Sequence, residues 1–172
     1  MIIDVFRDKV IPLLNKKRST PVNFIWGDSA YIREQLLTLK KSSATAPYRF
    51  PLIGLYSPFD EVVRNGRVTA NVSLILAMNT LPGYTNEQRM DVSFKGALRP
   101  LYDDFMEAMK EVRVFDVPYS GVFDHTYTEN FSFGKRGALD VDGKEVDEKI
   151  DVIEIKNLDL NLKTFDCYAN RL

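Results

Sequence analysis

The segment from Arg67 to Glu111 changes its hydrophobic pattern from period two to helical spacing. Every second residue of its first part is apolar, which predicts a strand with one buried face. Two further apolar residues, Ile75 and Ala77, predict that the end of this strand is covered on both faces. The alternating residues are Val68, Ala70, Val72, Leu74, Leu76 and Met78.

A helical region follows the turn residues 79–83. Thr85 and Gln88 have the spacing of a capping box, in which two side chains satisfy backbone N–H groups at a helix start. Gly96 and Pro100 predict a kink or a second helix near Pro100, because proline lacks a backbone donor. The apolar side holds Met90, Phe94, Ala97, Leu98, Leu101, Tyr102, Phe105 and Met109, and the side expected to face solvent holds Asp103, Asp104, Glu107 and Lys110.

The residues before this segment predict two more helices and two strands. Residues 2–15 have amphipathic helical spacing, and 21–26 form a short apolar run that predicts a strand. Asp28 and Ser29 are typical helix N-cap residues for a helix that ends at Lys41. Residues 48–56 are apolar at both parities, which predicts a strand covered on both faces.

Two local signals set the register of the predicted sheet. Asn65-Gly66 favours a two-residue hairpin turn, so residues 48–78 are expected to form an antiparallel pair with an irregular or hairpin-extended tip. In the last strand the apolar residues change parity between Ile155 and Leu158. A one-residue slip would turn a face inside out, so Lys156-Asn157 is expected to hold a bulge or a turn.

The segment 112–150 is rich in aromatic residues and predicts a long loop or β-extension. Connections of this length inside a compact domain are usually functional. The aromatic side chains of this segment can either pack on the core of the chain or contact another subunit, since aromatic residues are favoured at the centre of protein interfaces. The candidate interface residues are Phe115, Tyr119, Phe123, His125, Tyr127, Phe131 and Phe133.

Together these patterns predict a single α+β domain over residues 1–172, with an antiparallel or mixed sheet, helices on one face and the 112–150 extension. The formal net charge is −1, so no global basic field recruits nucleic acid. The single cysteine, Cys167, excludes an intrachain disulfide framework. Charges interrupt the apolar residues of the N-terminus, and no run reaches the length of a membrane span, so we expect a soluble protein made in the cytoplasm.

No catalytic motif is present. His125 is the only histidine, and with Asp124 or Glu129 it offers a weak metal cluster or a general base. Residues 140–143 begin like a calcium loop but lack its later carboxylates. Gly134-Lys-Arg-Gly137 is a basic turn without a following helix, so it does not match a phosphate-binding loop. We therefore predict no catalytic, metal or cofactor residues and no enzymatic activity.

The order of elements resembles the small α+β tail-terminator proteins of long-tailed phages, also described as tail-completion or head-tail connector proteins, as found in prophages of gut bacteria. The resemblance is carried by residues 74–89, by 93–102 and by the closing strand 153–162. It implies a homo-oligomeric ring, often of six subunits, that caps the tail tube and joins it to the head. It also implies tail-tube and connector proteins as partners, DNA only in passing, no membrane, and a location in the host cytoplasm and then in the virion.

Two other functions are kept as alternatives. One is a small hydrolytic or metal-dependent enzyme that uses His125. The other is a host binding module that uses the aromatic segment 115–133 for a peptide or glycan.

Overall fold

A mixed sheet of six strands organises the chain, as the computed structural model shows for residues 1–41, 49–81, 83–133 and 150–163. The strand order is β1-β2-β4-β6-β5, and β3 pairs with the start of β4. All neighbouring strands are antiparallel except β1 and β2. The α+β prediction is therefore confirmed. The strands are β1 (Asn23–Gly27), β2 (Leu52–Tyr56), β3 (Glu61–Arg64), β4 (Arg67–Asn79), β5 (Thr126–Phe133) and β6 (Ile150–Leu162).

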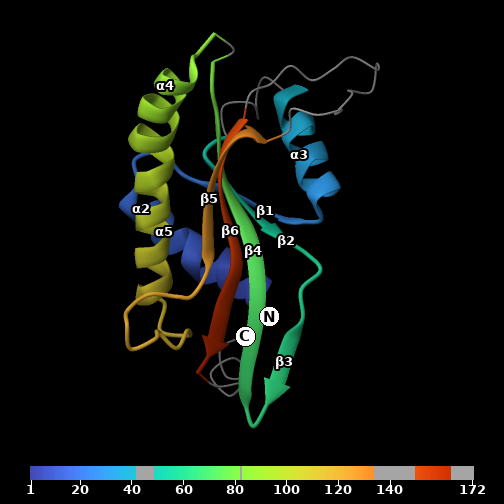
Figure 1. Cartoon of the computed structure of the whole chain (residues 1–172). Coiled ribbons are helices and arrows are strands. Elements are labelled where there is room, and N and C mark those ends of the chain that lie inside the picture. The colour runs from blue at the N-terminus through green and yellow to red at the C-terminus, as the bar shows by residue number, and fades with distance from the viewer. Residues whose placement is uncertain (42–48, 82, 134–149, 164–172) are drawn as a thin grey trace.

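Three helices cover the sheet (Figure 1). The first joins α1 (Ile2–Val5), a π-helical segment (Phe6–Val10) and α2 (Ile11–Lys17). The second is α3 (Ser29–Lys41), in which the Asp28 side chain accepts a hydrogen bond from the backbone N–H of Tyr31 at 2.8 Å. The third joins α4 (Asn86–Arg89), a π-helical segment (Met90–Leu98) and α5 (Arg99–Glu111).

The start and the interruption of the third helix follow the predicted signals. Both hydrogen bonds of the capping box form between Thr85 and Gln88. The predicted irregularity before Pro100 is the π-helical segment, at whose end the backbone N–H of Arg99 reaches Phe94 O, five residues back. Prolines and π-helical turns are both recognised causes of irregularity in a long helix.

The main core lies between one face of the sheet and the first and third helices. Leu74 and Leu76 of β4 face it with Ile153 and Ile155 of β6. Phe6 joins the two helices to the sheet, because its ring packs against Phe24, Phe105 and Phe115 with centroid distances of 6.1 to 6.3 Å. Aromatic packing of this kind adds to the free energy gained from burial alone.

The opposite face of the sheet is covered at one end by α3. The prediction that all helices pack on one face is therefore wrong. Because β1 and β2 are parallel, the chain must cross from the end of β1 back to the start of β2, and α3 is the helix in this crossover connection. Ile32 and Leu36 of α3 pack on Ile75 in a second apolar cluster. Gly54 leaves room for this packing, because a Cβ atom there would lie 3.1 Å from Ile75 Cγ1 and 3.4 Å from Ile32 Cδ1 of α3.

Among the residues that the structure describes, no helix lies over the remaining part of that face. We call β4 residues 74–79 and their neighbours the covered half, and β4 residues 67–73 and their neighbours the bare half. The predicted bulge separates the two halves: Leu74 pairs with Ile155, Val72 pairs with Leu158, and Lys156 and Asn157 lie between them. Asn157 has a φ of 54°. The predicted hairpin at Asn65-Gly66 also forms, with both residues at positive φ.

Candidate interaction surfaces

Tyr102 on α5 and His125 before β5 form one polar contact between the third helix and the sheet. The Tyr102 hydroxyl lies 2.8 Å from His125 Nε2, and His125 Nδ1 lies 2.7 Å from the carbonyl oxygen of Phe123. A carbonyl only accepts, so Nδ1 donates to it and Nε2 of the neutral ring accepts from the tyrosine. Burial, with the nearby Asp103 carboxylate, raises the pKa of Tyr102.

Arg99 and Glu129 form a second contact between the same two elements. Arg99 Nε and Nη2 donate to the two carboxylate oxygens of Glu129 at 2.7 and 3.2 Å. The Tyr127 hydroxyl donates to the same carboxylate at 2.7 Å. The hydrogen bond from Arg99 holds the pKa of Glu129 below its usual range, and burial raises the pKa of Tyr127.

These contacts bear on the predicted chemistry of His125. Glu129 is bound by Arg99 and Tyr127, and both ring nitrogens of His125 have partners within the chain. Across residues 1–41, 49–81, 83–133 and 150–163, no three His, Cys, Asp or Glu side chains are grouped so as to hold a metal ion. Asp124, His125 and Glu129 therefore do not form the metal cluster considered from the sequence. Residues 134–137 and 140–143 and Cys167 lie outside the described residues.

The predicted interface residues separate into core and surface. Phe115, Phe123 and Phe133 are buried inside the single chain, so their side chains are not available to a partner in this conformation. Phe131 is half-buried against Phe94, with ring centroids 4.4 Å apart. The exposed members are Tyr119, which is fully exposed, and Tyr127, and His125 is half-buried. Sequence composition alone cannot separate these groups, because aromatic residues serve both cores and interfaces.

A buried ion pair fixes the start of the third helix to the covered half. Arg89 donates to the Asp151 carboxylate and to the carbonyl oxygen of Phe131, and both charged side chains are almost fully buried. The guanidinium carbon also lies 5.4 Å from the centre of the Phe131 ring. This network is a structural one, since all its partners lie within the chain.

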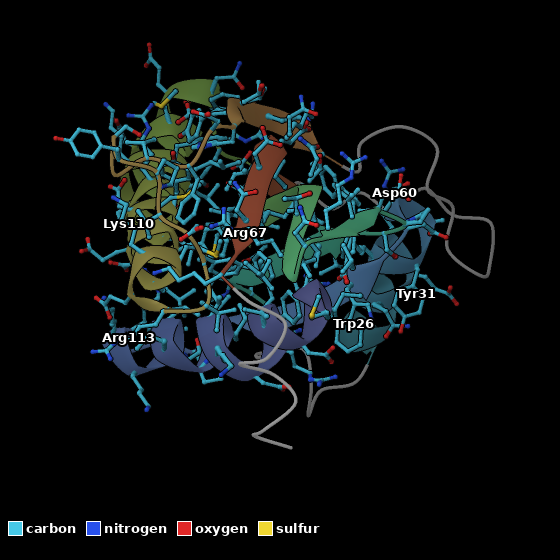
Figure 2. All side chains as sticks on the ribbon, turned by 90° about the horizontal axis from the view of Figure 1, so that it is seen from below. Trp26, Tyr31, Asp60, Arg67, Lys110 and Arg113 are labelled. Atoms are coloured by element: carbon cyan, nitrogen blue, oxygen red, sulfur yellow. The ribbon has the colours of Figure 1, made fainter. Side chains whose placement is uncertain are left out.

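The two edge strands of the sheet, β1 and β5, differ in sequence, and neither has a second partner strand among the described residues. β1 pairs only with β2, and β5 pairs only with β6. β1 has the sequence Asn-Phe-Ile-Trp-Gly, without a charge or a proline. Figure 2 shows Trp26 and Tyr31 at the opposite side of the view from Lys110 and Arg113. The sequence analysis treated Trp26 only as part of a strand. The absence of charge in this run is the signal that marks it as an unusual edge.

On β4 and β6 the outward face of the bare half is polar. Thr69 and Asn71 of β4 are exposed beside Asn161 and Asp159 of β6, and Asn71 Nδ2 donates to Asp159 Oδ1 at 2.7 Å. Near the hairpin, a shallow hollow is lined by Val62, Arg64, Asn65, Arg67 and Thr69. Water satisfies such side chains, so this face needs no protein cover.

Comparison with known proteins gives no family. No protein-family model matches the chain, and no curated protein matches it at a significant level. Within the ranges that the structure describes, no helix combines the length and apolar character needed to cross a membrane. The structure therefore shows an α+β protein whose sheet has two different edge strands, β1 and β5, each without a second partner strand among the described residues.

Proposed function

We propose that this chain is a structural subunit of a phage or prophage tail, of the tail-terminator kind that joins tail to head. In this proposal copies of the chain close into a ring at the end of the tail tube, in the host cytoplasm and then in the virion. The resemblance of residues 74–89, 93–102 and 153–162 to such proteins is the reason for naming this class.

One observation carries the proposal: the sheet ends in two different edges, β1 and β5, that have no partner strand among the described residues. A closed ring requires two unlike surfaces on each subunit, one of which fits the other on the next copy. Two identical surfaces would instead form a two-fold dimer. The sheet thus supplies the kind of asymmetry that a ring subunit needs.

The net charge is compatible with this role. The chain carries 23 basic and 24 acidic side chains, for a formal charge of −1. DNA binding strengthens with the number of phosphates that a protein neutralises. A ring of nearly neutral subunits therefore lets DNA pass through without holding it.

The test is to incubate the purified chain with tail tubes assembled from the tube protein of its own gene neighbourhood. Negative-stain images are expected to show a ring at one end of each tube, and light scattering of the released ring to give a multiple of the subunit mass. Tubes with bare ends at saturating protein would contradict the proposal. So would a gene neighbourhood without portal, connector and tail-tube genes.

A further inference from the structure

Two half-exposed aromatic side chains lie on one rung of the sheet, at its two opposite edges. Trp26 on β1 pairs with Leu55, Leu55 with Leu74, Leu74 with Ile155, and Ile155 with Tyr127 on β5. Directly paired residues of neighbouring strands share a face, so Trp26 and Tyr127 lie on the same face of the sheet. Their exposures are similar, at 39% and 38%.

Both side chains are held in place by aromatic neighbours within the chain. Trp26 packs beside Phe24, with ring centroids 5.8 Å apart. Tyr127 packs edge-on to Tyr102 at 5.0 Å, and its hydroxyl donates to Glu129. Each ring therefore presents a fixed, partly uncovered surface at its edge of the sheet. Fixed aromatic side chains lose little conformational entropy on binding.

The two edges also run in opposite directions. β1 is parallel to β2, β2 is antiparallel to β4, β4 to β6, and β6 to β5. It follows that β1 and β5 are antiparallel. In a ring whose axis runs along the strands, rotation keeps each strand's direction along that axis. The β5 edge of one copy then meets the β1 edge of the next as an antiparallel pair, with a regular hydrogen-bond ladder.

Closure of a ring also fixes the register. Cyclic symmetry has no translation along its axis, so the neighbour's β5 lies at the height of the chain's own β5. Trp26 shares a rung with Tyr127, so in a ring whose strands run along its axis the two aromatic side chains meet side by side across the interface. Aromatic pairs directly opposite each other on antiparallel strands are favourable contacts.

Charge does not oppose this pairing. Isolated edges in soluble proteins are usually protected by charged side chains, prolines or bulges. The five residues of β1 include none of these, and the Glu129 carboxylate on β5 is paired with Arg99. An uncharged apolar strand that has no covering element in the described chain is suited to a partner strand.

We propose that β1 of one copy and β5 of the next form a continuous antiparallel sheet, in which Trp26 packs against Tyr127. The partner is a second copy of this chain, and the inference rests on the ring proposed above. It identifies the contact that closes the ring, in place of the 115–133 aromatic segment as a whole.

The register selects a cross-linking test that leaves Trp26 and Tyr127 unchanged. Ile25 and Thr128 share the next rung, through Gly54, Ile75 and Glu154, and lie on the opposite face. In a Cys167→Ser background, Ile25→Cys and Thr128→Cys proteins are prepared separately, assembled on tail tubes alone or as an equal mixture, and oxidised. Residues opposite each other on paired strands are within disulfide reach.

The expected result is a disulfide-linked dimer in the mixture and none in either variant alone. Rings on the tubes without this dimer would overturn the inference and leave the proposed function standing. Dimers of Ile25→Cys alone would show that two β1 edges meet, which also overturns it. If no ring forms even with the unmodified chain, the proposed function fails, and the inference fails with it.

A second variant pair tests the aromatic contact itself. Trp26→Lys places a charge on the β1 edge, and Val92→Lys places one at an exposed position on the third helix. Trp26→Lys is expected to abolish rings on the tubes while its thermal transition stays that of the Val92→Lys control. Rings formed equally by both variants would contradict the role given to Trp26.

Discussion

The covered half and the bare half of the sheet are exposed in different ways. On the bare half one face has no helix over it among the described residues, and its exposed side chains on β4 and β6 are polar, with Asn71 hydrogen-bonded to Asp159. On the covered half helices pack on both faces, and the two edge strands β1 and β5 have no further partner strand among the described residues; the β1 edge carries no charge. The first kind of exposure suits water, and the second suits another strand. The size of an exposed area is thus less informative than its chemistry.

The largest effect is expected from breaking the buried ion pair of the covered half. Asp151→Asn leaves the Arg89 guanidinium buried without its countercharge, which typically costs about 3–5 kcal/mol. The matched control is Asp159→Asn on the bare half, where an exposed hydrogen bond is weakened and the cost is expected to stay under about 1 kcal/mol. Urea unfolding of the two variants measures both. Equal losses would contradict the contrast between the halves.

An intermediate effect is expected at the bulge that separates the two halves. Asn157 has a φ of 54°, a left-handed conformation that asparagine tolerates and alanine disfavours. Asn157→Ala is expected to reduce the free energy of unfolding by about 1–2 kcal/mol. Asn157→Gly fits the same backbone and is expected to stay within about 0.5 kcal/mol of the parent. A thermal melt that ranks glycine below alanine would show that the bulge is not retained in solution.

The smallest effect is expected at the partly buried pair of Arg99 and Glu129 on the covered half, and it depends on pH. Hydrogen bonding to Arg99 lowers the pKa of Glu129 in the folded state relative to the unfolded chain. The ionised carboxylate therefore favours folding at neutral pH, and this contribution is lost as the pH falls from about 5 toward about 3. Glu129→Gln is expected to flatten stability against pH in that window, with less effect at pH 7 than Asp151→Asn. If stability falls with pH as steeply in Glu129→Gln as in the parent chain, this assignment is wrong.

Local signals explain how much of the fold could be predicted from the sequence. The alternation in β4, the capping box at Thr85, the turn at Asn65-Gly66 and the bulge at Lys156-Asn157 each depend on residues close together in the chain. The structure confirms all four. The parallel pairing of β1 with β2, and hence the place of α3, depends on contacts between distant residues, and no local pattern encodes them.

The candidate surface was harder to predict for a related reason. Phe115, Phe123 and Tyr119 are all aromatic residues of the same segment, yet the two phenylalanines are buried and the tyrosine is exposed. Trp26 becomes notable only when the register is known, because its relation to Tyr127 passes through three intervening strands. Whether a residue lies on an edge strand, and which residues share its rung, depends on how all the strands pair, so a local sequence pattern does not predict it.

Amide hydrogen exchange tests the central claim most directly, by comparing the free chain with the chain assembled on tail tubes. The account predicts that peptides covering 23–27 and 126–130 exchange quickly in the free chain and become protected together on assembly. Peptides from the bare half, such as 67–71, are expected to keep their exchange rate. Protection that appears on the bare half while both edges stay unprotected would contradict the account.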